Sequence, residues 1–369
     1  MLIINSNMHL NINGTTSFFI NITKESLKQQ HDVLCIINKR NLELYRVLNN
    51  INDDKIRIKT VSNNRLLAFF QYSFIYMFNR KNAIAIIHDI HRIQLAITKV
   101  LGIKSYVSIF GEGAKKLYKS KRWLQGILPA KKYHYDNLKV DYPNNKIMYF
   151  PYMVELDENR INKQKQEKFT FGCLGAFIET KGFRQVILAS DILRKKYTNF
   201  QVFIGGGGSK EEELKQLVND LKLGDYVKFV GKVSDKDTFY NKLDVFVFST
   251  YKEDIGMVIP EAISYRVPIM GNRIGFLSDI LTENEYLMVE AKDLEDVEKI
   301  WPAKDSDKIW WQVKTNYRFE TQPLDANLLA EKMDFAINNY ETMKKASENA
   351  YNKIGQYSLD KQITRLINL

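Results

Sequence analysis

The stretch KEDIGMVIPEA at residues 252–262 decides how the second half of this chain is expected to fold. It follows an apolar run at residues 244–249, DVFVFS, whose β-branched and aromatic side chains are typical of a buried strand. Proline is tolerated only in the first turn of a helix, so the pattern predicts a helix that begins between Met257 and Pro260. The stretch is therefore expected to be a strand, a short loop and a helix.

Two carboxylates flank a glycine in this stretch. Glu253 is expected in the loop above the carboxyl end of the strand, and Glu261 near the positive end of the helix. Free N–H groups around Gly256 can face an anion, while carboxylates suit a ligand rich in hydroxyls. A nucleotide sugar has hydroxyls at both ends and a diphosphate between them. The pattern therefore favours a nucleotide-sugar site.

The chain is long and unevenly charged. Its 369 residues exceed what one hydrophobic core usually serves, so about two domains are expected. Residues 1–155 hold 23 Lys and Arg against 10 Asp and Glu, whereas the remainder holds 31 against 33, so the net charge of +11 comes from the first part. This asymmetry predicts an anionic partner for the N-terminal part. The polar stretch at residues 155–168 is the expected linker.

The chain is predicted to be cytoplasmic and to lack a membrane span. Residues 1–10 show no basic region followed by a long apolar run, so no signal peptide is expected. No run approaches the roughly 18 consecutive apolar residues of a spanning helix. Cys35 and Cys173 lie in separate apolar runs, and two reduced buried thiols are expected rather than a disulfide or a metal pair.

Both halves alternate strand-like and helix-like segments. This alternation predicts parallel sheets with helices on both faces. Strands are expected in the first half at residues 2–5, 32–37, 83–87, 105–110 and 147–150. Strands are expected in the second half at residues 169–175, 201–204, 227–230, 244–249 and 286–289.

In order and spacing, these elements resemble the retaining glycosyltransferases of the group-1 family (family 4), of the type found in bacterial polysaccharide and lipopolysaccharide synthesis. The resemblance is strongest over residues 169–279. Glu253 and Glu261 match the family's Glu-x7-Glu motif. Its Gly-Arg-x4-Lys-Gly element is matched by Gly175, Lys181 and Gly182, and its glycines after two further strands are matched by Gly205 and Gly231.

The resemblance implies an α/β protein with the GT-B fold, in which two Rossmann-like domains have parallel sheets that face each other across a cleft. Residues 1–155 would form the domain that binds the acceptor, and residues 156–345 the domain that binds the nucleotide sugar. Residues 346–369 would form a C-terminal helix that crosses back to the N-terminal domain.

The resemblance also implies roles for individual residues. Glu253 would contact the hydroxyls of the donor sugar, Glu261 the ribose and Lys181 the diphosphate, which makes Glu253 and Lys181 the expected catalytic groups. Because Ala176 stands where the family has an arginine, Arg184 is the expected second phosphate cation. The expected donor site comprises Gly14, Lys181, Arg184, Gly205, Gly231, Val233, Glu253, Ile255, Gly256, Met257 and Glu261.

The acceptor side departs from the family pattern. Phe110 stands where the family has an active-site histidine. His88, His91 and Glu112 are then the candidates for contacting the acceptor. His88 is the expected catalytic residue because a histidine can accept a proton near neutral pH. A structural histidine at the end of a strand is an equally open interpretation.

Residues 115–132 hold seven basic residues and no acid, with aromatic and aliphatic residues between them. A basic amphipathic segment can lie in a membrane interface, where each basic residue contributes about 1 kcal/mol. We predict that it meets an anionic membrane surface or a lipid-linked acceptor; a solvated face and a nucleic-acid patch are the alternatives. The residues expected at this contact are Glu112, Lys115, Lys116, Lys119, Lys121, Arg122 and Trp123.

Two Asp-x-Asp pairs imitate a metal-binding motif. Asp235 and Asp237 lie where they can cap a short helix, and Asp305 and Asp307 lie in a charged loop. Both pairs are expected to be surface carboxylates, so no metal and no cofactor are expected beyond the substrate itself.

Together these features predict a cytoplasmic enzyme that associates peripherally with the inner face of the cytoplasmic membrane and binds no nucleic acid. It would transfer a sugar from a nucleoside diphosphate to a hydroxyl of a lipid-linked or glycan acceptor. A nucleotide-sugar epimerase or hydrolase on the same fold would instead turn over donor without an acceptor. Ala176 and Phe110 also leave open a non-catalytic protein that binds glycan or lipid through a decayed site.

Overall fold

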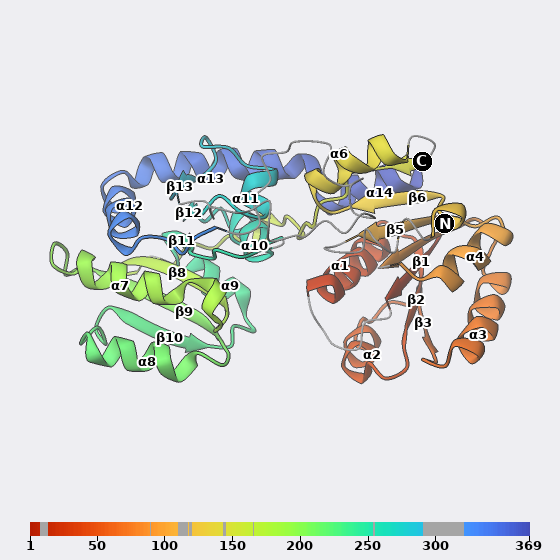
Figure 1. Cartoon of the computed structure of the whole chain (residues 1–369), viewed down its shortest axis with the longest axis horizontal. Helices are drawn as coiled ribbons and strands as arrows, with labels where there is room; N and C mark the ends of the chain where they lie inside the picture. The colour runs from red at the N-terminus through yellow and green to blue at the C-terminus, as the bar shows by residue number, and fades with distance from the viewer. Residues whose placement is uncertain are drawn as a thin grey trace, which may run out of the picture. The chain divides into compact units, whose positions relative to one another are not determined.

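The computed structural model describes residues 1–7, 14–88, 90–109, 117, 120–142, 145–164, 166–253, 255–290 and 321–369. The chain divides into two compact units (Figure 1). Unit 1 contains Met1–Glu155 and Tyr357–Leu369, and unit 2 contains the described residues from Leu156 to Gln356.

Unit 1 is built on a seven-stranded parallel sheet with the strand order β3-β2-β1-β4-β5-β6-β7. Its strands are β1 (Leu2–Asn7), β2 (Asp32–Asn38), β3 (Ile56–Val61), β4 (Ala83–His88), β5 (Lys104–Ile109), β6 (Gly126–Pro129) and β7 (Lys146–Ile147). Its helices are α1 (Gly14–Lys28), α2 (Leu42–Asn49), α3 (Arg65–Phe78), α4 (Arg92–Val100), α6 (Lys132–Asp141) and α14 (Leu359–Ile367), with a 3-10 turn, η2 (Lys121–Trp123).

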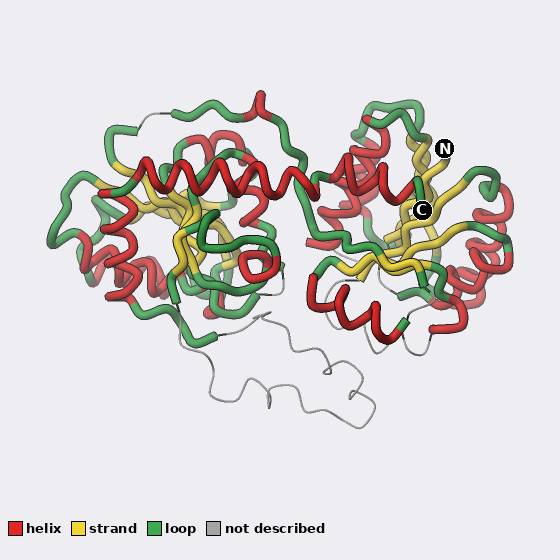
Figure 2. Tube along the Cα trace, turned by 90° about the horizontal axis from the view of Figure 1, so that it is seen from above, coloured by secondary structure: helices red, strands yellow, loops and turns green. Residues whose placement is uncertain are grey.

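Strand β2 shows how the sheet is covered on both faces. Val33 and Ile37 pack into one hydrophobic cluster with residues of α1 and α2, whereas Ile36 packs into another with residues of α3 and α4. This division follows from the alternation of side chains along a strand. Because both faces are buried, the strand is an almost continuous apolar run, as parallel strands usually are. Figure 2 shows the strands enclosed by helices in each unit.

Unit 2 is built on a six-stranded parallel sheet with the order β10-β9-β8-β11-β12-β13. Its strands are β8 (Phe169–Ala176), β9 (Phe200–Gly207), β10 (Val227–Gly231), β11 (Val245–Phe248), β12 (Ile269–Gly271) and β13 (Leu287–Met288). Its helices are α7 (Phe183–Leu193), α8 (Glu211–Asp220), α9 (Lys236–Asn241), α10 (Val258–Ser264), α11 (Phe276–Asp279), α12 (Ala326–Asn338) and α13 (Tyr340–Ile354), with a 3-10 turn, η4 (Glu179–Lys181).

Each sheet reverses its winding direction at one point. In unit 1 the chain winds from β1 toward β2 on one side and continues from β4 on the other, and in unit 2 the same reversal separates β8 from β11. Ligands of such sheets bind outside the carboxyl ends of the strands at this switch point. The loops after β8 and β11 are therefore the first place to look for a site in unit 2.

The C-terminal segment, predicted as one helix over residues 346–369, is divided between two helices. α13 ends at Ile354 in unit 2, and α14 packs on α1 in unit 1. The Gln362 side chain donates to the carbonyl of Pro151 at 3.2 Å, and Gln29 on α1 donates to the carbonyl of Asp360 at 3.0 Å. The last helix is thus part of the unit that contains the N-terminal residues.

The polar stretch expected as a linker is packed at its start against unit 2. The backbone N–H groups of Asn162 and Gln164 donate to Asn241 at 2.9 Å each. Between them, the Lys163 ammonium donates to the carbonyl of Leu243 at 3.4 Å. Burial lowers the pKa of Lys163 to about 8, although the nearby Asp244 carboxylate acts in the opposite direction.

The lowered pKa of Lys163 predicts a specific pH dependence of stability. The Lys163 pKa is about 8 in the folded chain against an ordinary value of 10.5, so between these values the unfolded chain binds more protons. The free energy of unfolding should therefore rise with pH across this window, relative to a Lys163→Met variant. Urea unfolding of both proteins at several pH values measures the difference. Parallel pH profiles would contradict the lowered pKa of Lys163.

Candidate functional site

An ion pair spans the switch point of unit 2. Lys181 ends the turn η4 that follows β8, and Glu253 lies in the loop that follows β11. The Lys181 ammonium contacts a Glu253 carboxylate oxygen, and the two side chains are only 20% and 18% exposed. The two residues that sequence analysis singled out for the donor are thus brought together at the carboxyl ends of neighbouring strands.

The backbone around Lys181 is fastened to the exit of β11. The Ser249 hydroxyl donates to the Lys181 carbonyl at 2.8 Å, and the Tyr251 N–H donates to the Thr180 carbonyl at 3.0 Å. Gly182 follows with a φ of +67°, and a Cβ there would lie 2.2 Å from the Ser249 carbonyl oxygen. Only glycine fits this close approach. Gly182 therefore lets the backbone that carries Lys181 lie directly against the exit of β11.

The loop that carries Glu253 is supported from the start of α11. The Phe276 N–H donates to the Ile255 carbonyl at 2.8 Å. Gly256 has a φ of +78° and its carbonyl accepts from the Ile259 N–H at 2.9 Å, which leads into α10. This helix begins at Val258, so the helix start predicted from Pro260 is confirmed.

Glu261 lies on α10 with its carboxylate held from α9. It forms an ion pair with Lys236 and accepts from the Tyr240 hydroxyl at 3.1 Å, and its side chain is 12% exposed. Burial, with the Glu261 charge beside it, raises the pKa of Tyr240 well above its ordinary value, so the hydroxyl stays protonated and donates. Lys236 and Tyr240 were missed from the sequence. A carboxylate among apolar helix residues was the signal that such partners are needed.

The glycine run at the end of β9 packs against the end of β8 and against Val233, which lies in the loop after β10. A Cβ on Gly205 would lie 2.8 Å from the Val233 side chain, and a Cβ on Gly206 would lie 1.9 Å from the Gly175 carbonyl oxygen. These contacts explain the glycines by close packing between two strand ends. Their expected contact with a donor remains a prediction.

The other residues expected at the donor site lie on or beside four different elements. Arg184 is exposed in the first turn of α7, Gly231 ends β10 with a φ of +69°, and Met257 precedes α10. Gly14 is the first residue of α1 in unit 1. Nothing in their surroundings tests whether they bind a donor.

His88 is locked inside unit 1. It is 2% exposed, and its Nε2 lies 2.8 Å from the Asn5 side-chain oxygen. Asn5 in turn donates to the Phe19 carbonyl at 2.9 Å and to Thr23 at 3.0 Å. The His88 ring also meets the Phe19 ring edge-to-face at 5.6 Å. This environment favours the structural interpretation of His88 over the catalytic one.

The basic segment at residues 115–132 is not one amphipathic surface. Leu124, Ile127 and Leu128 are buried, because residues 126–129 form the parallel strand β6 inside the sheet. A Cβ on Gly126 would lie 2.3 Å from the Tyr106 ring, so the glycine lets β6 pair closely with β5. These three apolar side chains are therefore enclosed in the unit, and the membrane contact expected of the whole segment remains a prediction.

Two of the described basic residues of this segment lie in one short turn. Lys121, Arg122 and Trp123 form the single turn η2, in which Arg122 lies over the Trp123 ring at 4.6 Å. The Arg122 carbonyl accepts from Lys99 at 2.6 Å. The other expected contact residues, Glu112, Lys115, Lys116 and Lys119, lie outside the described residues, as do Phe110, Asp305 and Asp307.

The remaining Asp-x-Asp pair is structural. Asp235 caps α9 by accepting from the Thr238 N–H at 3.0 Å, and Asp237 accepts from Arg160 at 2.8 Å. Hydrogen bonds from Tyr265 and Arg160 hold the pKa of Asp237 below its ordinary value. Both carboxylates are thus engaged in holding α9.

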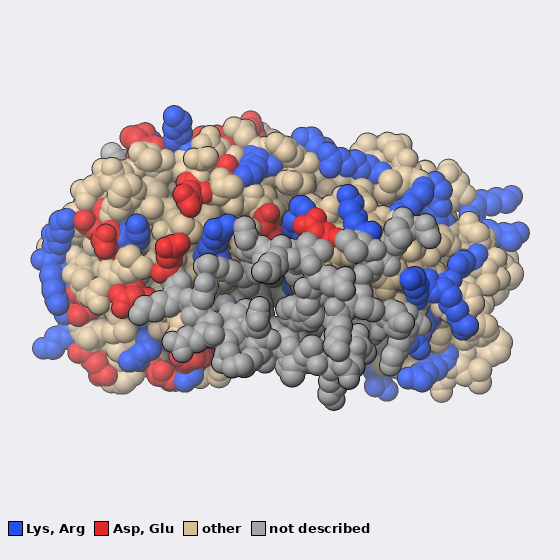
Figure 3. All heavy atoms as spheres, turned by 45° about the horizontal axis from the view of Figure 1, so that its top comes forward, with Lys and Arg blue, Asp and Glu red and all other residues tan. Residues whose placement is uncertain are grey.

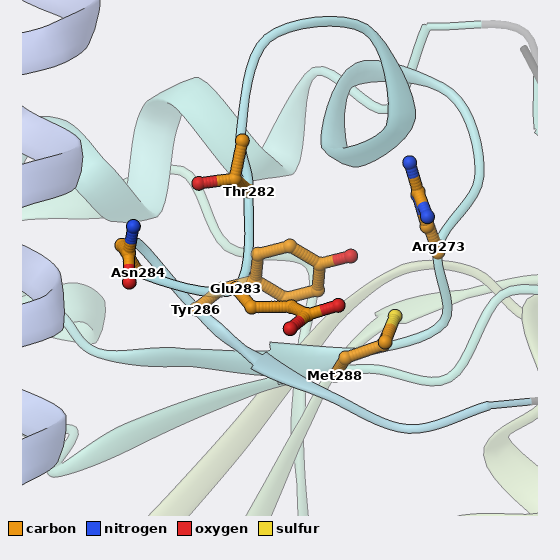
Figure 4. A pocket seen from close by; sticks show the side chains of 6 residues that line it. All are labelled: Arg273, Thr282, Glu283, Asn284, Tyr286 and Met288. Atoms are coloured by element: carbon orange, nitrogen blue, oxygen red, sulfur yellow. The ribbon is translucent and has the colours of Figure 1, made fainter. Parts of the chain in front are cut away.

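A shallow pocket of about 310 Å³ lies elsewhere on unit 2. In Figure 4 the Tyr286 hydroxyl and the Glu283 carboxylate point toward the side on which Arg273 lies. The lining residues, Arg273, Thr282, Glu283, Asn284, Tyr286 and Met288, follow β12 or lie in and before β13. None of them belongs to the expected donor site. The pocket and the Lys181–Glu253 pair are therefore separate features.

Replacement of Gly182 tests how the site is held. Gly182→Ala should lower the free energy of unfolding by about 1–3 kcal/mol, because alanine is strained at this φ and collides with Ser249. Gly224→Ala is the matched control, since a Cβ at Gly224 has no atom within 4 Å and no positive φ is required. Urea unfolding measures both variants. Equal stabilities of the two would contradict the close packing at Gly182.

Comparison with known proteins shows which family the segment around this site is similar to. Residues 155–300 match the family model of glycosyl transferases group 1. The capsular polysaccharide biosynthesis glycosyltransferase CapM of Staphylococcus aureus is 24% identical over 274 residues, 73% of this chain and 62% of CapM. The lipopolysaccharide core biosynthesis glycosyltransferase LpsD of Rhizobium meliloti is 31% identical over 121 residues, 32% of this chain and 34% of LpsD. The matches thus span less than two thirds of either relative.

Solved structures show the same fold. A glycosyltransferase of Rickettsia africae superposes with a TM-score of 0.72 at 15% identity, covering 99% of this chain and 97% of that one. Anabaena HepE, crystallised with UDP, superposes with a TM-score of 0.71 at 12% identity and covers 100% of both chains. The predicted α/β fold of the GT-B type is confirmed. Residues 155–300, which hold Lys181, Glu253 and Glu261, are the segment that is similar to the glycosyl transferases of group 1.

Proposed function

We propose that this protein transfers a sugar from a nucleoside diphosphate to a hydroxyl of a lipid-linked or glycan acceptor in surface-polysaccharide synthesis. The observation that carries the proposal is the Lys181–Glu253 pair at the switch point of unit 2, inside the segment that matches the family. The names of CapM and LpsD, which refer to capsule and lipopolysaccharide core, support the kind of product.

The donor would bind by taking over the two halves of this ion pair. The Lys181 ammonium would meet the diphosphate, and the Glu253 carboxylate would accept hydrogen bonds from hydroxyls of the sugar. HepE has been crystallised with UDP and with UDP-glucose, and Staphylococcus aureus TarM with UDP, which supports a nucleoside diphosphate as the carrier. Lys181, whose ammonium lies at the switch point, is the cation we assign to the diphosphate.

Charge development explains why the lysine matters for rate. As the bond from the sugar C1 to the diphosphate oxygen breaks, negative charge grows on the leaving group. A cation whose backbone is fastened at Gly182 and Ser249 is already placed at the switch point, where it can stabilise that charge. Lysine acts there as a point charge with three donors. The Lys181 ammonium would therefore bind the transition state more tightly than the ground state.

Retention of configuration would follow from attack on the face that the leaving group occupies. The acceptor oxygen forms its bond to C1 while the bond to the diphosphate breaks, and the proton of the acceptor hydroxyl passes to a departing diphosphate oxygen. This route requires no protein nucleophile. It also assigns no proton transfer to His88, whose ring is enclosed by Asn5 and Phe19.

Glu261 would hold the ribose, with Lys236 and Tyr240 fixing its carboxylate. A contact to the ribose is the same before and during bond breakage, so it should strengthen binding without changing the chemical step.

Turnover assays test the catalytic assignment. Glu253→Gln and Lys181→Met should each lower kcat by about 100-fold or more, because each removes a group that acts on the transition state. Lys196→Met, which breaks an exposed ion pair with Asp334, is the matched control and should keep full activity. Nucleoside diphosphate release is measured with candidate donors, with and without lipid-linked and glycan acceptors. Unchanged kcat in the first two variants would refute the assignment, and release independent of acceptor would favour a hydrolase.

A second assay separates binding from chemistry. Tyr240→Phe removes one hydrogen bond to Glu261 while keeping the ring that stacks on Tyr265 at 5.1 Å. The KM for the donor should rise by about three- to tenfold while kcat stays within about twofold. This is expected when the lost contact stabilises the ground state and the transition state equally. A fall in kcat at constant KM would contradict the ribose assignment for Glu261.

A further inference from the structure

Helix α3 is apolar on two opposite faces, of which only one is buried. Tyr72 and Tyr76 are fully buried beside the sheet. On the other side, Phe70, Phe74 and Phe78 are 61%, 63% and 67% exposed. The apolar side chains of the exposed face are Leu66, Leu67, Phe69, Phe70, Phe74, Met77 and Phe78. A helix that is hydrophobic all round is normally enclosed on all sides.

This exposed face is preformed. The Asn64 side chain caps the helix by accepting from the N–H groups of Leu66 and Leu67 at 3.1 Å each. The Phe74 and Phe78 rings lie 4.5 Å apart on the exposed face. The helix packs beside α4 on one face of the sheet (Figure 1). A large, fixed apolar patch of this kind usually marks an interaction site.

The surroundings of the patch are strongly basic. Residues 55–104 contain nine Lys and Arg and a single acid, Asp89. Figure 3 shows Lys and Arg frequent over unit 1 on the face drawn, where Asp and Glu are few. The basic residues exposed just before, within and just after α3 are Arg57, Lys59, Arg65, Arg80 and Lys81.

We propose that α3 is the element that docks this protein on a membrane rich in anionic lipid. Its aromatic and aliphatic side chains would enter the boundary between headgroups and acyl chains, while the flanking Arg and Lys would meet lipid phosphates. The helix has 14 residues, and none of the described helices is long and apolar enough to cross a bilayer. The helix would therefore lie in the interface.

The charge around α3 selects this occupant over a second copy of the chain. Two copies joined through this face would bring like-charged clusters together, which opposes association, whereas an anionic surface is complementary to them. The proposal rests on the proposed function only in that a lipid-linked acceptor gives membrane docking its purpose. It also moves the predicted membrane contact from residues 115–132 to α3.

Vesicle flotation of the full-length chain tests the proposal. The protein should float with vesicles of phosphatidylglycerol and phosphatidylcholine, and bind pure phosphatidylcholine about tenfold or more weakly. Phe70→Ser combined with Phe74→Ser should weaken binding by about tenfold or more, since two aromatic rings lose their apolar environment. Leu42→Ser combined with Tyr45→Ser is the matched control, because these residues are exposed on α2 across the sheet and should leave binding unchanged.

Charge-reversal variants provide a second, independent test of membrane binding. Arg80→Glu combined with Lys81→Glu should weaken binding to the anionic vesicles by about tenfold or more. Lys121→Glu combined with Arg122→Glu, in the turn η2, should have little effect. Circular dichroism confirms that each variant is folded. Wild-type protein that floats with neither vesicle, or α3 variants that float like wild type, would overturn the proposal.

Two further measurements show what covers the patch: the depth at which α3 enters the membrane, and the oligomeric state of the protein. Phe74→Trp should gain quenching by brominated lipid, whereas Tyr45→Trp should not. Light scattering should report a monomer without lipid. A dimer that Phe70→Ser and Phe74→Ser together convert to a monomer, without vesicle binding by the wild type, would overturn the proposal in favour of a second copy. Because none of these measurements involves donor turnover, failure here is distinguishable from failure of the proposed function.

Discussion

The account depends on the contact of the Lys181 ammonium with the Glu253 carboxylate across the switch point of unit 2. A parallel sheet places the loops after β8 and β11 beside each other, and Gly182 lets them meet backbone to backbone at Ser249. Opposite charges held this way, with little exposed surface, have limited freedom to rearrange. That constraint makes the pair a prepared site for a ligand that carries both an anion and hydroxyls, as a nucleotide sugar does.

The parts of this site that could be predicted from the sequence are those governed by local rules. Pro260 determines where α10 begins, and glycines mark the positive φ angles at Gly182 and Gly256. The partners of Glu261 could not be predicted, because Lys236 and Tyr240 reach it only through the packing of α9 on α10. Side-chain identity alone does not reveal which surfaces two helices share. The roles of the glycine run at the end of β9 needed the same three-dimensional information.

Unit 1 shows the limits of sequence patterns more plainly. Gly126–Pro129 is too short and too close to basic residues to read as a strand, yet it pairs inside the sheet as β6. Ile56–Val61 alternates apolar and polar residues, which is a recognisable strand pattern, yet this strand is not among those predicted from the sequence. In α3 nearly every residue is apolar, so the pattern cannot tell the face that packs on the sheet from the face that remains exposed. The exposed fraction of each side chain of α3 had to be known before a membrane contact could be proposed for that helix.

The two units thus present different chemistry. Unit 2 has an ion pair at the proposed donor site, and unit 1 has a basic, partly apolar surface. The central claim concerns the first of these. A crystal structure of the protein with a nucleoside diphosphate sugar tests it most directly. The account predicts the diphosphate at the Lys181 ammonium and sugar hydroxyls at the Glu253 carboxylate. A donor bound elsewhere, with the Lys181–Glu253 contact intact, would contradict it.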